Sequence, residues 1–488
     1  MRLALLLSLL PAFAQDTVIV GARIADGTGA PLKSGHVRIH GDTIVRIGNF
    51  RPTKADRIID AQGLILAPGF IDPHNHSDRG LLNEPNAVSQ VSQGITTVLL
   101  GQDGSSGFPV SEWLKSHRDH PSALNVATLV GHATLRSRVM GQNYRRLATP
   151  EEISQMAQLL SQAIDDGAFG LSSGLEYEVG SYADTAEMIA LAKAATRHRG
   201  PAGFYMSHLR DEGDQSLASI RELIRIAEQA QLPAQISHLK LASIAVWGKT
   251  AEVVALVDDA RRRGLHITAD CYPYEAWSSG ITVLVLDKQY DNPQSVAKGL
   301  ADVGGPQNVT VTRCQAHPDF EFQTLAQIAE KTHQTAVDVF RQIVRDGGAT
   351  VIGQAMREAD VRAFYRQPWV MVSSDGGIAS RHPRGAGTYP RVLGRLVREA
   401  KVLTLPQAIH KMTGMPAALL QLSDRGRVAV GAKADLVLFH PQTVLDQATF
   451  ADPLALSSGI EKVWVNGQLV WSGGRPTGAH PGSVLARH

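Results

Sequence analysis

Short apolar runs alternate with amphipathic segments over residues 68–420, and no other feature constrains the fold of this chain as strongly. The apolar runs, of four to seven residues, have the length of buried strands, whereas the amphipathic segments show helical spacing. About eight such strand-then-helix units predict a (β/α)8 barrel of the TIM type with insertions. Doubly wound and flavodoxin-like sheets share the alternation. The expected strands include TTVLL, NVATLV, AFGLSS, AGFYMSHL, PAQISHLK, HITADCYP, VTVTRC and WVMVSSD, and the helix-start residues include Thr149 and Thr185.

The two ends of the chain show a different sequence pattern, typical of short strands joined by turns. Residues 15–67 contain short Val- and Ile-rich runs separated by Gly and Asp turns, and residues 421–488 repeat this pattern. In the second segment Asn466-Gly467 is a hairpin signal between two apolar runs. We therefore expect a small β-sandwich domain built from both ends of the chain.

The first fourteen residues resemble a secretory signal peptide. Arg2 precedes an apolar run over residues 3–10, and the triplet Ala12-Phe13-Ala14 predicts cleavage after Ala14. The apolar run is much shorter than the ~20 residues of a membrane-spanning helix. The sequence therefore predicts an exported protein, periplasmic or secreted, without a membrane anchor once the signal peptide is removed.

The net charge and the cysteine content limit the classes of binding partner that the sequence suggests. With 48 basic and 46 acidic residues the net charge is +2, and no run of like charges indicates nucleic-acid binding. A small neutral or anionic substrate is the simpler expectation. Cys271 and Cys314, the two cysteines of the chain, provide no disulfide framework and no CxxC zinc motif, and we expect two separate buried thiols. Whether the chain forms a homo-oligomer is left open.

Histidines and carboxylates follow the predicted strands where those strands end. In a (β/α)8 barrel the carboxyl ends of the strands meet at the mouth that carries the active site. Two histidines spaced i and i+2 on a strand face the same side. Four strand-end histidines accompanied by carboxylates suit zinc or a similar divalent ion. These residues are His74 and His76 after GFID, Asp103 after TTVLLG, Glu176 after FGLSSGL, His208 after FYMS, His238 after AQIS and Asp375 after VMVSS.

The order of these residues along the chain resembles the amidohydrolase superfamily, and more narrowly the N-acyl-D-amino-acid deacylases, or D-aminoacylases. The resemblance covers nearly the whole mature chain. It rests on APGFIDPHNH, SQGITTVLLG, GFYMSHLRDEGD, QISHLKLA, TADCYPYEAWSSG, SSDG, HPRGAGTYPRVLGR, KMTGMPAALL and ADLVLFHP. It implies an amidohydrolase-type barrel with one or two zinc ions, two being favoured, and hydrolysis of a linear amide.

One position departs from the family pattern. D-aminoacylases usually carry a metal-bridging cysteine in a GNCG-like turn after the second strand, whereas this chain reads GQDG with Asp103 in that place. Other amidohydrolases bridge their metals with a carboxylated lysine after the fourth strand, where this chain has Glu176. We therefore expect Glu176 to bridge two ions, with Asp103 as a supporting ligand or as a partner that orients a histidine. A single-metal site on His208 and His238 is the alternative.

The resemblance also implies roles for the remaining metal-site residues. His74 and His76 would bind one ion, and His208 and His238 the other. Asp375 would lie at the metal site and act as the general base that moves a proton from water to the leaving amine.

An N-acyl amino acid has a free α-carboxylate that requires a cation. Lys240 lies two residues after His238, so on a continuing strand it would face the same side. Arg384 lies in the expected loop after Asp375, and its guanidinium suits a carboxylate. Tyr272 and Ser278, from CYPYEAWS, are candidate hydroxyl donors by family position, and Tyr177 is expected to line the same pocket.

Three functions remain in competition. The first is deacylation of N-acyl-D-amino acids or of related dipeptide-like amides. The second is hydrolysis of isoaspartyl dipeptides or of cyclic amides, as in dihydroorotases and hydantoinases. The third is an inactive, metal-stabilised binding protein, which the complete ligand set together with Asp375 argues against.

Overall fold

The computed structural model describes residues 15–196 and 203–487. The expected signal peptide, residues 1–14, lies outside the described residues. Within the described ranges, no helix has both the length and the apolar character required to cross a bilayer.

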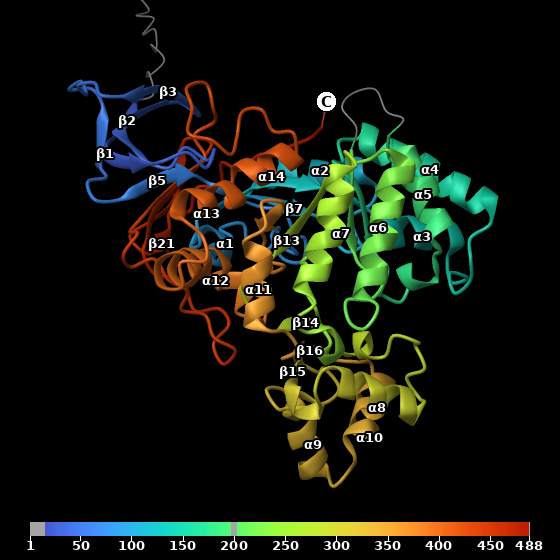
Figure 1. Cartoon of the computed structure of the whole chain (residues 1–488). Helices are drawn as coiled ribbons and strands as arrows, with labels where there is room; N and C mark the ends of the chain where they lie inside the picture. The colour runs from blue at the N-terminus through green and yellow to red at the C-terminus, as the bar shows by residue number, and fades with distance from the viewer. Residues whose placement is uncertain (1–14, 197–202, 488) are drawn as a thin grey trace, which may run out of the picture.

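A barrel of parallel strands forms the centre of the molecule (Figure 1). Two parallel arcs, one running from β6 to β8 and the other from β9 to β17, build it, and β8 and β9 are separated by Leu129 alone. The barrel closes where Asp375 N–H donates to the His74 carbonyl and where Asn75 and Gly376 form a parallel bridge. The strands are β6 (Phe70–Asp72), β7 (Ile95–Leu100), β8 (Asn125–Thr128), β9 (Val130–Gly131), β10 (Gly170–Gly174), β11 (Phe204–His208), β12 (Ala234–Ile236), β13 (Ile267–Cys271) and β17 (Val370–Val372).

The apolar runs form these strands because nearly every barrel-strand residue is buried on both faces. With β8 and β9 sharing one position, the nine named strands fill the eight positions of a (β/α)8 barrel. The predicted barrel is therefore confirmed.

Helices cover the outside of the barrel. They include α1 (Val88–Val91), α2 (Val110–Asp119), α3 (His132–Met140), α4 (Pro150–Asp165), α5 (Thr185–Ala195), α6 (Ser216–Ala230), α7 (Thr250–Arg262), α11 (Glu358–Tyr365), α12 (Arg384–Arg391), α13 (Leu405–Met412) and α14 (Gly414–Leu419). Thr149 caps α4 in a capping box with Glu152, as expected. α5 begins at Thr185, as expected, and the preceding Asp184 caps it by accepting the Glu187 N–H.

Both ends of the chain contribute to one β domain, as predicted. Hydrogen bonds join its strands into a single nine-stranded sheet, whereas a sandwich was expected, and in this sheet β5 from the N-terminal segment pairs antiparallel with β18 from the C-terminal segment. Asn466 and Gly467 both have positive φ in the turn between β19 and β20, as the hairpin signal indicated. The strands are β1 (Thr17–Ile24), β2 (Lys33–His40), β3 (Thr43–Gly48), β4 (Arg57–Asp60), β5 (Ile65–Pro68), β18 (Leu436–Phe439), β19 (Ile460–Val465), β20 (Gln468–Ser472) and β21 (Arg475–Pro476).

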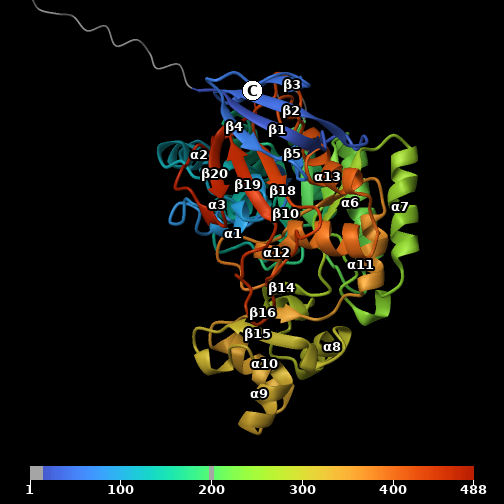
Figure 2. The ribbon, with the colours of Figure 1, turned by 90° about the vertical axis from the view of Figure 1, so that its left-hand side faces the viewer.

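A separate lobe is inserted between β13 and β17, and Figures 1 and 2 show it projecting from one end of the barrel. It contains a three-stranded antiparallel sheet and three α-helices, namely β14 (Trp277–Gly280), β15 (Val309–Arg313), β16 (Thr350–Gly353), α8 (Pro293–Asp302), α9 (Leu325–Thr332) and α10 (Ala336–Arg345). The expectation that VTVTRC is a barrel strand was therefore wrong. This segment is β15, whose exposed Arg313 and half-buried Thr310 fit a small sheet better than the barrel interior.

Candidate metal centre

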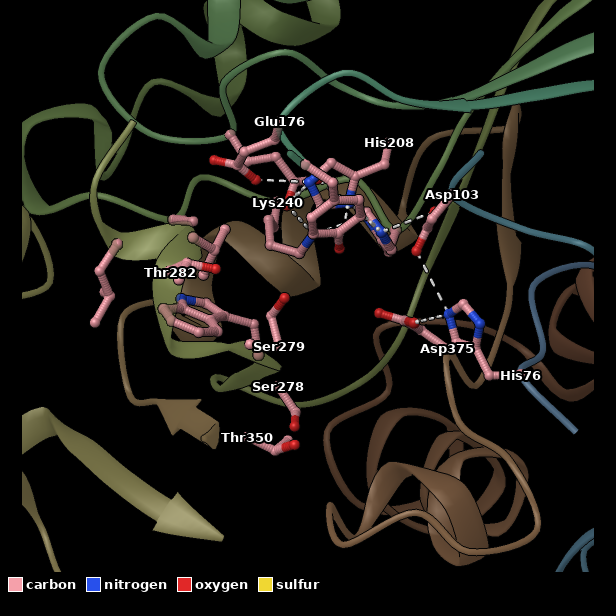
Figure 3. A pocket seen from close by; sticks show the side chains of 18 of the residues that line it. His76, Asp103, Glu176, His208, Lys240, Ser278, Ser279, Thr282, Thr350 and Asp375 are labelled. Carbon is pink, nitrogen blue, oxygen red and sulfur yellow. Dashed lines mark hydrogen bonds and ion pairs between the residues drawn. The ribbon is translucent and has the colours of Figure 1, made fainter. Parts of the chain in front are cut away.

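The strand-end residues converge at one mouth of the barrel, on a cavity of about 700 Å³. Figure 3 shows Asp103 and His76 on one side of this cavity and His208, Glu176 and Lys240 on another. Ser278, Ser279, Thr282 and Thr350 of the inserted lobe line the opposite wall. The cavity therefore lies between the barrel and the inserted lobe.

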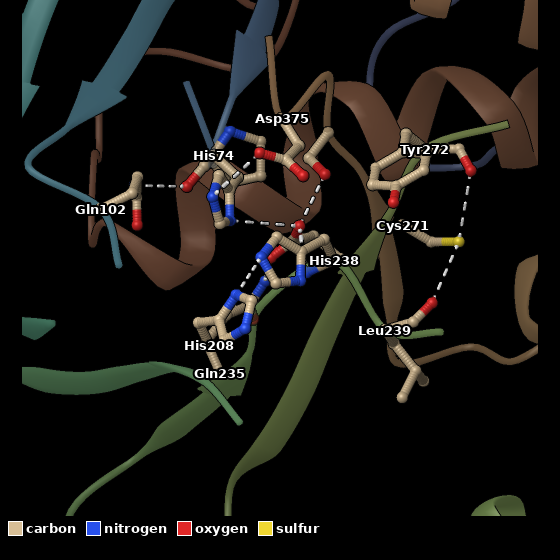
Figure 4. A network of polar contacts seen from close by, with 12 residues as sticks. His74, Gln102, His208, Gln235, His238, Leu239, Cys271, Tyr272 and Asp375 are labelled. Atoms are coloured by element: carbon tan, nitrogen blue, oxygen red, sulfur yellow. Dashed lines mark hydrogen bonds and ion pairs between the residues drawn. The ribbon is translucent and has the colours of Figure 1, made fainter. Parts of the chain in front are cut away.

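A first cluster joins residues that follow four barrel strands, β6, β7, β12 and β17. His74, Asp103, His238 and Asp375 each place one nitrogen or oxygen within 4.8 Å of the others. His74 Nε2 is 3.5 Å from Asp103 Oδ1 and 3.5 Å from Asp375 Oδ1. His76 reaches the same carboxylates, with Nε2 3.4 Å from Asp103 Oδ2 and 3.2 Å from Asp375 Oδ1. The structure therefore brings together five of the residues selected from the sequence. Figure 4 shows His74, His238 and Asp375 of this group side by side.

Buried polar atoms in this cluster have no hydrogen-bond partner among the described residues. Both ring nitrogens of His74 and Oδ1 of Asp103 are in this state. Unpaired buried polar atoms are rare and need an explanation. Imidazole nitrogens facing carboxylate oxygens form a donor set that suits zinc or a similar divalent ion, so the residues present fit a metal.

A second cluster shares His238 with the first. It consists of His208, Glu212 and His238, again with ligand atoms within 4.8 Å of one another. His238 Nδ1 is 3.0 Å from Glu212 Oε1, and His208 Nδ1 is 3.0 Å from His238 Nε2. Glu212 did not emerge from the sequence reasoning. It follows His208 by four residues in the loop after β11, where no strand or helix period indicates a shared face.

The two carboxylates considered as a bridge occupy different places. Glu176 Oε2 is 2.6 Å from His208 Nε2, and the residue belongs to neither cluster. Asp103 Oδ1 lies 3.5 Å from His74 Nε2 and 3.7 Å from His238 Nε2, between the two halves of the site. Asp103, rather than Glu176 as expected, thus lies between the two halves of the site.

Three of the site residues have left-handed backbone conformations, which set the directions of their side chains. Asp103, His238 and Asp375 have φ values of 54°, 32° and 46°. Such conformations are uncommon outside glycine, and they cluster at functional sites where the surroundings enforce them. At His238 the turn is enforced by the Asp270 carboxylate, which accepts its backbone N–H at 2.9 Å.

The charged side chains of the cluster shift one another's pKa values. Burial opposes protonation of His76, but hydrogen bonds and charge from Asp103 and Asp375 outweigh it and raise the pKa of His76 to about 9. Burial and Lys240 oppose protonation of His238, yet nearby carboxylates raise its pKa to about 10. Burial favours the neutral acid of Asp103, but the surrounding histidines hold its pKa well below the usual range. The site is therefore a dense array of opposite charges.

Two buried cations flank the clusters. Lys240 Nζ lies 2.6 Å from Glu212 Oε2 and 2.7 Å from His238 Nδ1. The expected strand does not continue to Lys240, because β12 ends at Ile236, but the following turn brings the ammonium back to the site. Arg384 Nη1 lies 2.7 Å from Asp375 Oδ2. Arg384 is the first residue of α12, rather than a loop residue as expected.

The predicted hydroxyl residues line the cavity with different orientations. Tyr177 OH is 3.1 Å from His208 Nδ1. The ring of Tyr272 lies beneath the Arg384 guanidinium at 4.7 Å, and its hydroxyl contacts Met356 Sδ at 3.7 Å. The Tyr272 hydroxyl thus points toward Met356 rather than toward the metal clusters. The Ser278 carbonyl accepts a hydrogen bond from Arg384 Nη2 at 3.3 Å.

Outside the site, both cysteines are free and buried, which confirms the expectation of two separate thiols.

Comparisons with known proteins agree with this geometry. The chain is 37% identical to an N-acyl-D-aspartate deacylase of Alcaligenes xylosoxydans xylosoxydans, covering 96% of this chain and 95% of the relative. It is 34% identical to a D-aminoacylase of the same organism, covering 97% and 98%. A solved N-acyl-D-glutamate deacylase from Bordetella bronchiseptica, complexed with zinc and a phosphonate inhibitor, superposes with a TM-score of 0.88 at 33% identity, covering 97% and 100%.

More distant structures share the fold alone. A D-hydantoinase superposes with a TM-score of 0.60 at 16% identity, over 97% of this chain and 99% of the other. A sequence model described as "Amidohydrolase family" matches residues 57–471, which span the barrel, the inserted lobe and part of the β domain. The chain belongs to the amidohydrolase family.

Proposed function

We propose that this protein hydrolyses the amide bond of N-acyl-D-amino acids with the help of zinc. The observation that carries the proposal is the pair of ligand clusters sharing His238 in a cavity that also holds two buried cations. Relatives named as deacylases of N-acyl-D-aspartate and N-acyl-D-glutamate, each 37% identical, support the same substrate class. A solved D-aminoacylase described as having a binuclear metal centre supports two ions.

The ligand groups suggest how two zinc ions would be held. His74, His76, Asp103 and Asp375 would hold one ion, and His208, Glu212 and His238 the other. Asp103 would contact both ions because its carboxylate lies between the two halves. Glu176, 2.6 Å from His208 Nε2, would orient that histidine rather than bridge.

The reaction then assigns a task to each remaining group. When bound, zinc acts as a Lewis acid that polarises the amide carbonyl and lowers the pKa of water toward ~7. Asp375 accepts a proton from the attacking water and passes it to the leaving amine nitrogen. Arg384 offers a planar pair of donors to the substrate α-carboxylate, and Lys240 adds a point charge. Tyr177 and Ser278 complete the wall of the substrate pocket.

A substrate panel tests this function. Zinc-loaded protein is given N-acetyl-D-amino acids, N-acetyl-L-amino acids, β-aspartyl dipeptides and hydantoins, and amine release or ring opening is followed. We expect turnover of the D-series and a loss of about 10²-fold or more in kcat for Asp375→Asn. Preferred turnover of β-aspartyl dipeptides or of cyclic amides would replace the proposal with the corresponding activity. No turnover across the panel would favour a binding protein.

We also infer that the protein is exported and acts in the periplasm or outside the cell, free of the membrane, on a small-molecule substrate. The basis is the apolar run over residues 3–10 followed by Ala12-Phe13-Ala14. Cell fractionation and N-terminal sequencing of the mature chain test this inference. A mature chain that begins at Gln15 in the exported fraction is expected, whereas a chain that keeps Met1 in the cytoplasm would refute it.

A further inference from the structure

His382 is a buried histidine beside the site that the proposed reaction does not use. His382 is 1% exposed and lies in the segment between β17 and α12. Its Nε2 is 3.0 Å from the Ala276 carbonyl oxygen, and its Nδ1 is 3.0 Å from the backbone nitrogen of Arg384. The ring therefore connects the chain after β13 with the first residue of α12.

These two contacts determine the protonation of the ring. A carbonyl oxygen can only accept a hydrogen bond, and a backbone N–H can only donate one. His382 is therefore neutral, with its proton on Nε2 and its lone pair on Nδ1. Burial lowers the pKa of His382 well below its usual range, and the neighbouring Arg384 cation lowers it further. The ring is thus a fixed connector with one donor and one acceptor.

Aromatic side chains hold this connector in place. The rings of Tyr274 and Phe450 pack edge-on against His382, at centroid distances of 5.4 Å and 5.2 Å. Rotation of the imidazole would break both hydrogen bonds and both ring contacts. The orientation of His382 is therefore set by three separate segments of the chain.

The position of Arg384 depends on the same connection. The first N–H groups of a helix have no partner within the helix, and Nδ1 of His382 satisfies the one that belongs to Arg384. The Arg384 guanidinium then reaches Asp375 Oδ2 at 2.7 Å, the Ser278 carbonyl at 3.3 Å and the Tyr272 ring at 4.7 Å. Ser278 and Tyr272 lie on the chain segment that His382 ties to α12 through Ala276.

We propose that His382 is a positioning residue. It holds Arg384 against the part of the cavity wall formed by Tyr272 and Ser278, so that the guanidinium can select substrates with a free α-carboxylate. The inference rests on the proposed function, and it concerns specificity rather than the bond-breaking step. Among the described residues, His382 does not line the cavity, and the hydrogen bonds of its ring go to Ala276 and Arg384 rather than to a proposed metal ligand.

Three substitutions of His382 test its two hydrogen bonds, at Nδ1 and at Nε2, separately. His382→Asn keeps an acceptor near the Nδ1 position, His382→Gln keeps a donor near the Nε2 position, and His382→Phe keeps only the ring packing. The readout is the ratio of kcat/KM for an N-acetyl-D-amino acid to that for its carboxamide, which lacks the charged carboxylate. A general loss of stability would lower both rates and would leave this ratio unchanged.

We expect His382→Phe and His382→Gln to reduce the ratio about 10-fold, mainly through KM of the acid, while His382→Asn recovers most of it. Adding Arg384→Met to His382→Phe should cause little further loss, because both changes act through one guanidinium. His117→Asn is the control, since His117 is buried against Trp113 away from the cavity, and its ratio should not change.

An unchanged ratio in folded His382→Phe, or equal ratios in all three variants, would overturn the proposal. Calorimetric binding of the acid and the carboxamide gives the same comparison without turnover. It therefore distinguishes a failure of His382 positioning from a failure of the proposed hydrolase function, in which the unsubstituted protein turns over neither compound.

Discussion

Asp375 and Arg384 form a buried ion pair, with Asp375 Oδ2 2.7 Å from Arg384 Nη1. The pair joins the end of the last barrel strand to the first residue of α12. Each partner has a second task in the proposed reaction, since Asp375 moves a proton and Arg384 holds the substrate carboxylate. A substrate that binds Arg384 therefore shares the guanidinium with the general base.

Replacing Arg384 with lysine should weaken substrate binding more than folding. Lysine keeps the charge but loses the planar pair of donors. We expect kcat/KM to fall about 10- to 100-fold, mostly through a higher KM, as measured by steady-state kinetics. Arg381→Lys is the control, because Arg381 lines the same cavity but pairs with Glu321 at 2.6 Å. An equal effect of both substitutions would contradict the role of Arg384.

Asp103 and Glu176 should differ in their effect on metal content. Asp103→Asn removes the charge between the two ligand clusters, whereas Glu176→Gln removes the charge beside His208 alone. The number of zinc ions per chain, measured by inductively coupled plasma mass spectrometry after dialysis, should fall in Asp103→Asn and remain unchanged in Glu176→Gln. The reverse pattern would restore Glu176 as the bridging residue.

Zinc should stabilise the folded chain. The unpaired atoms of His74 and Asp103 lose their desolvation cost when they coordinate an ion, and an unfolded chain lacks the assembled site. At a zinc concentration of about 100 Kd the gain is about 2.7 kcal/mol, visible as a higher unfolding midpoint in calorimetry. Chelation should reverse the shift, and Asp103→Asn should remove most of it. The same zinc-induced shift in Asp103→Asn would place the ion elsewhere.

Glu187 should contribute stability that is lost in acid. Its buried carboxylate accepts from His132 Nε2 at 2.8 Å and pairs with Arg136 Nη1. Burial favours the neutral acid, but His132 and Arg136 outweigh it and hold the pKa of Glu187 below its usual 4.5. A lowered folded-state pKa stabilises the fold above the unfolded pKa, and this contribution disappears as the pH falls through the folded pKa.

Glu187→Gln should therefore cost about 3–5 kcal/mol at pH 7, because the Arg136 cation stays buried without its counterion. Urea unfolding at pH 7 and below pH 4.5 measures this, and the gap between variant and unsubstituted chain should narrow at the lower pH. Glu358→Gln, which disrupts the exposed pair with Arg362, should cost no more than about 0.5 kcal/mol. A gap that is independent of pH would assign the stability to packing rather than to charge.

Local patterns were sufficient for much of the barrel and for most site residues. A parallel strand is buried on both faces and appears as an apolar run, and its carboxyl end is where a polar residue can face the mouth. This placed His74, His76, His208, His238 and Asp375 correctly at the mouth. The capping box at Thr149 was equally local, because the Thr149 and Glu152 side chains need only each other and the backbone.

Other features depended on how distant segments meet. VTVTRC has the composition of a barrel strand, and only its pairing with β16 assigns it to the inserted lobe. Glu212 lies in a loop, so its contact with His238 follows from the path of the chain after β11 rather than from any period in the sequence.

The sequence alone determined that four histidines and several carboxylates would meet at the mouth of a barrel, because strand direction and burial follow from residue type. It could not decide which carboxylate lies between the two halves of the site. That choice follows from the left-handed turn at Asp103 and from the separate position of Glu176 beside His208. Ligand geometry is set at the scale of a few ångströms, where the packing of loops from different strands decides which atoms meet.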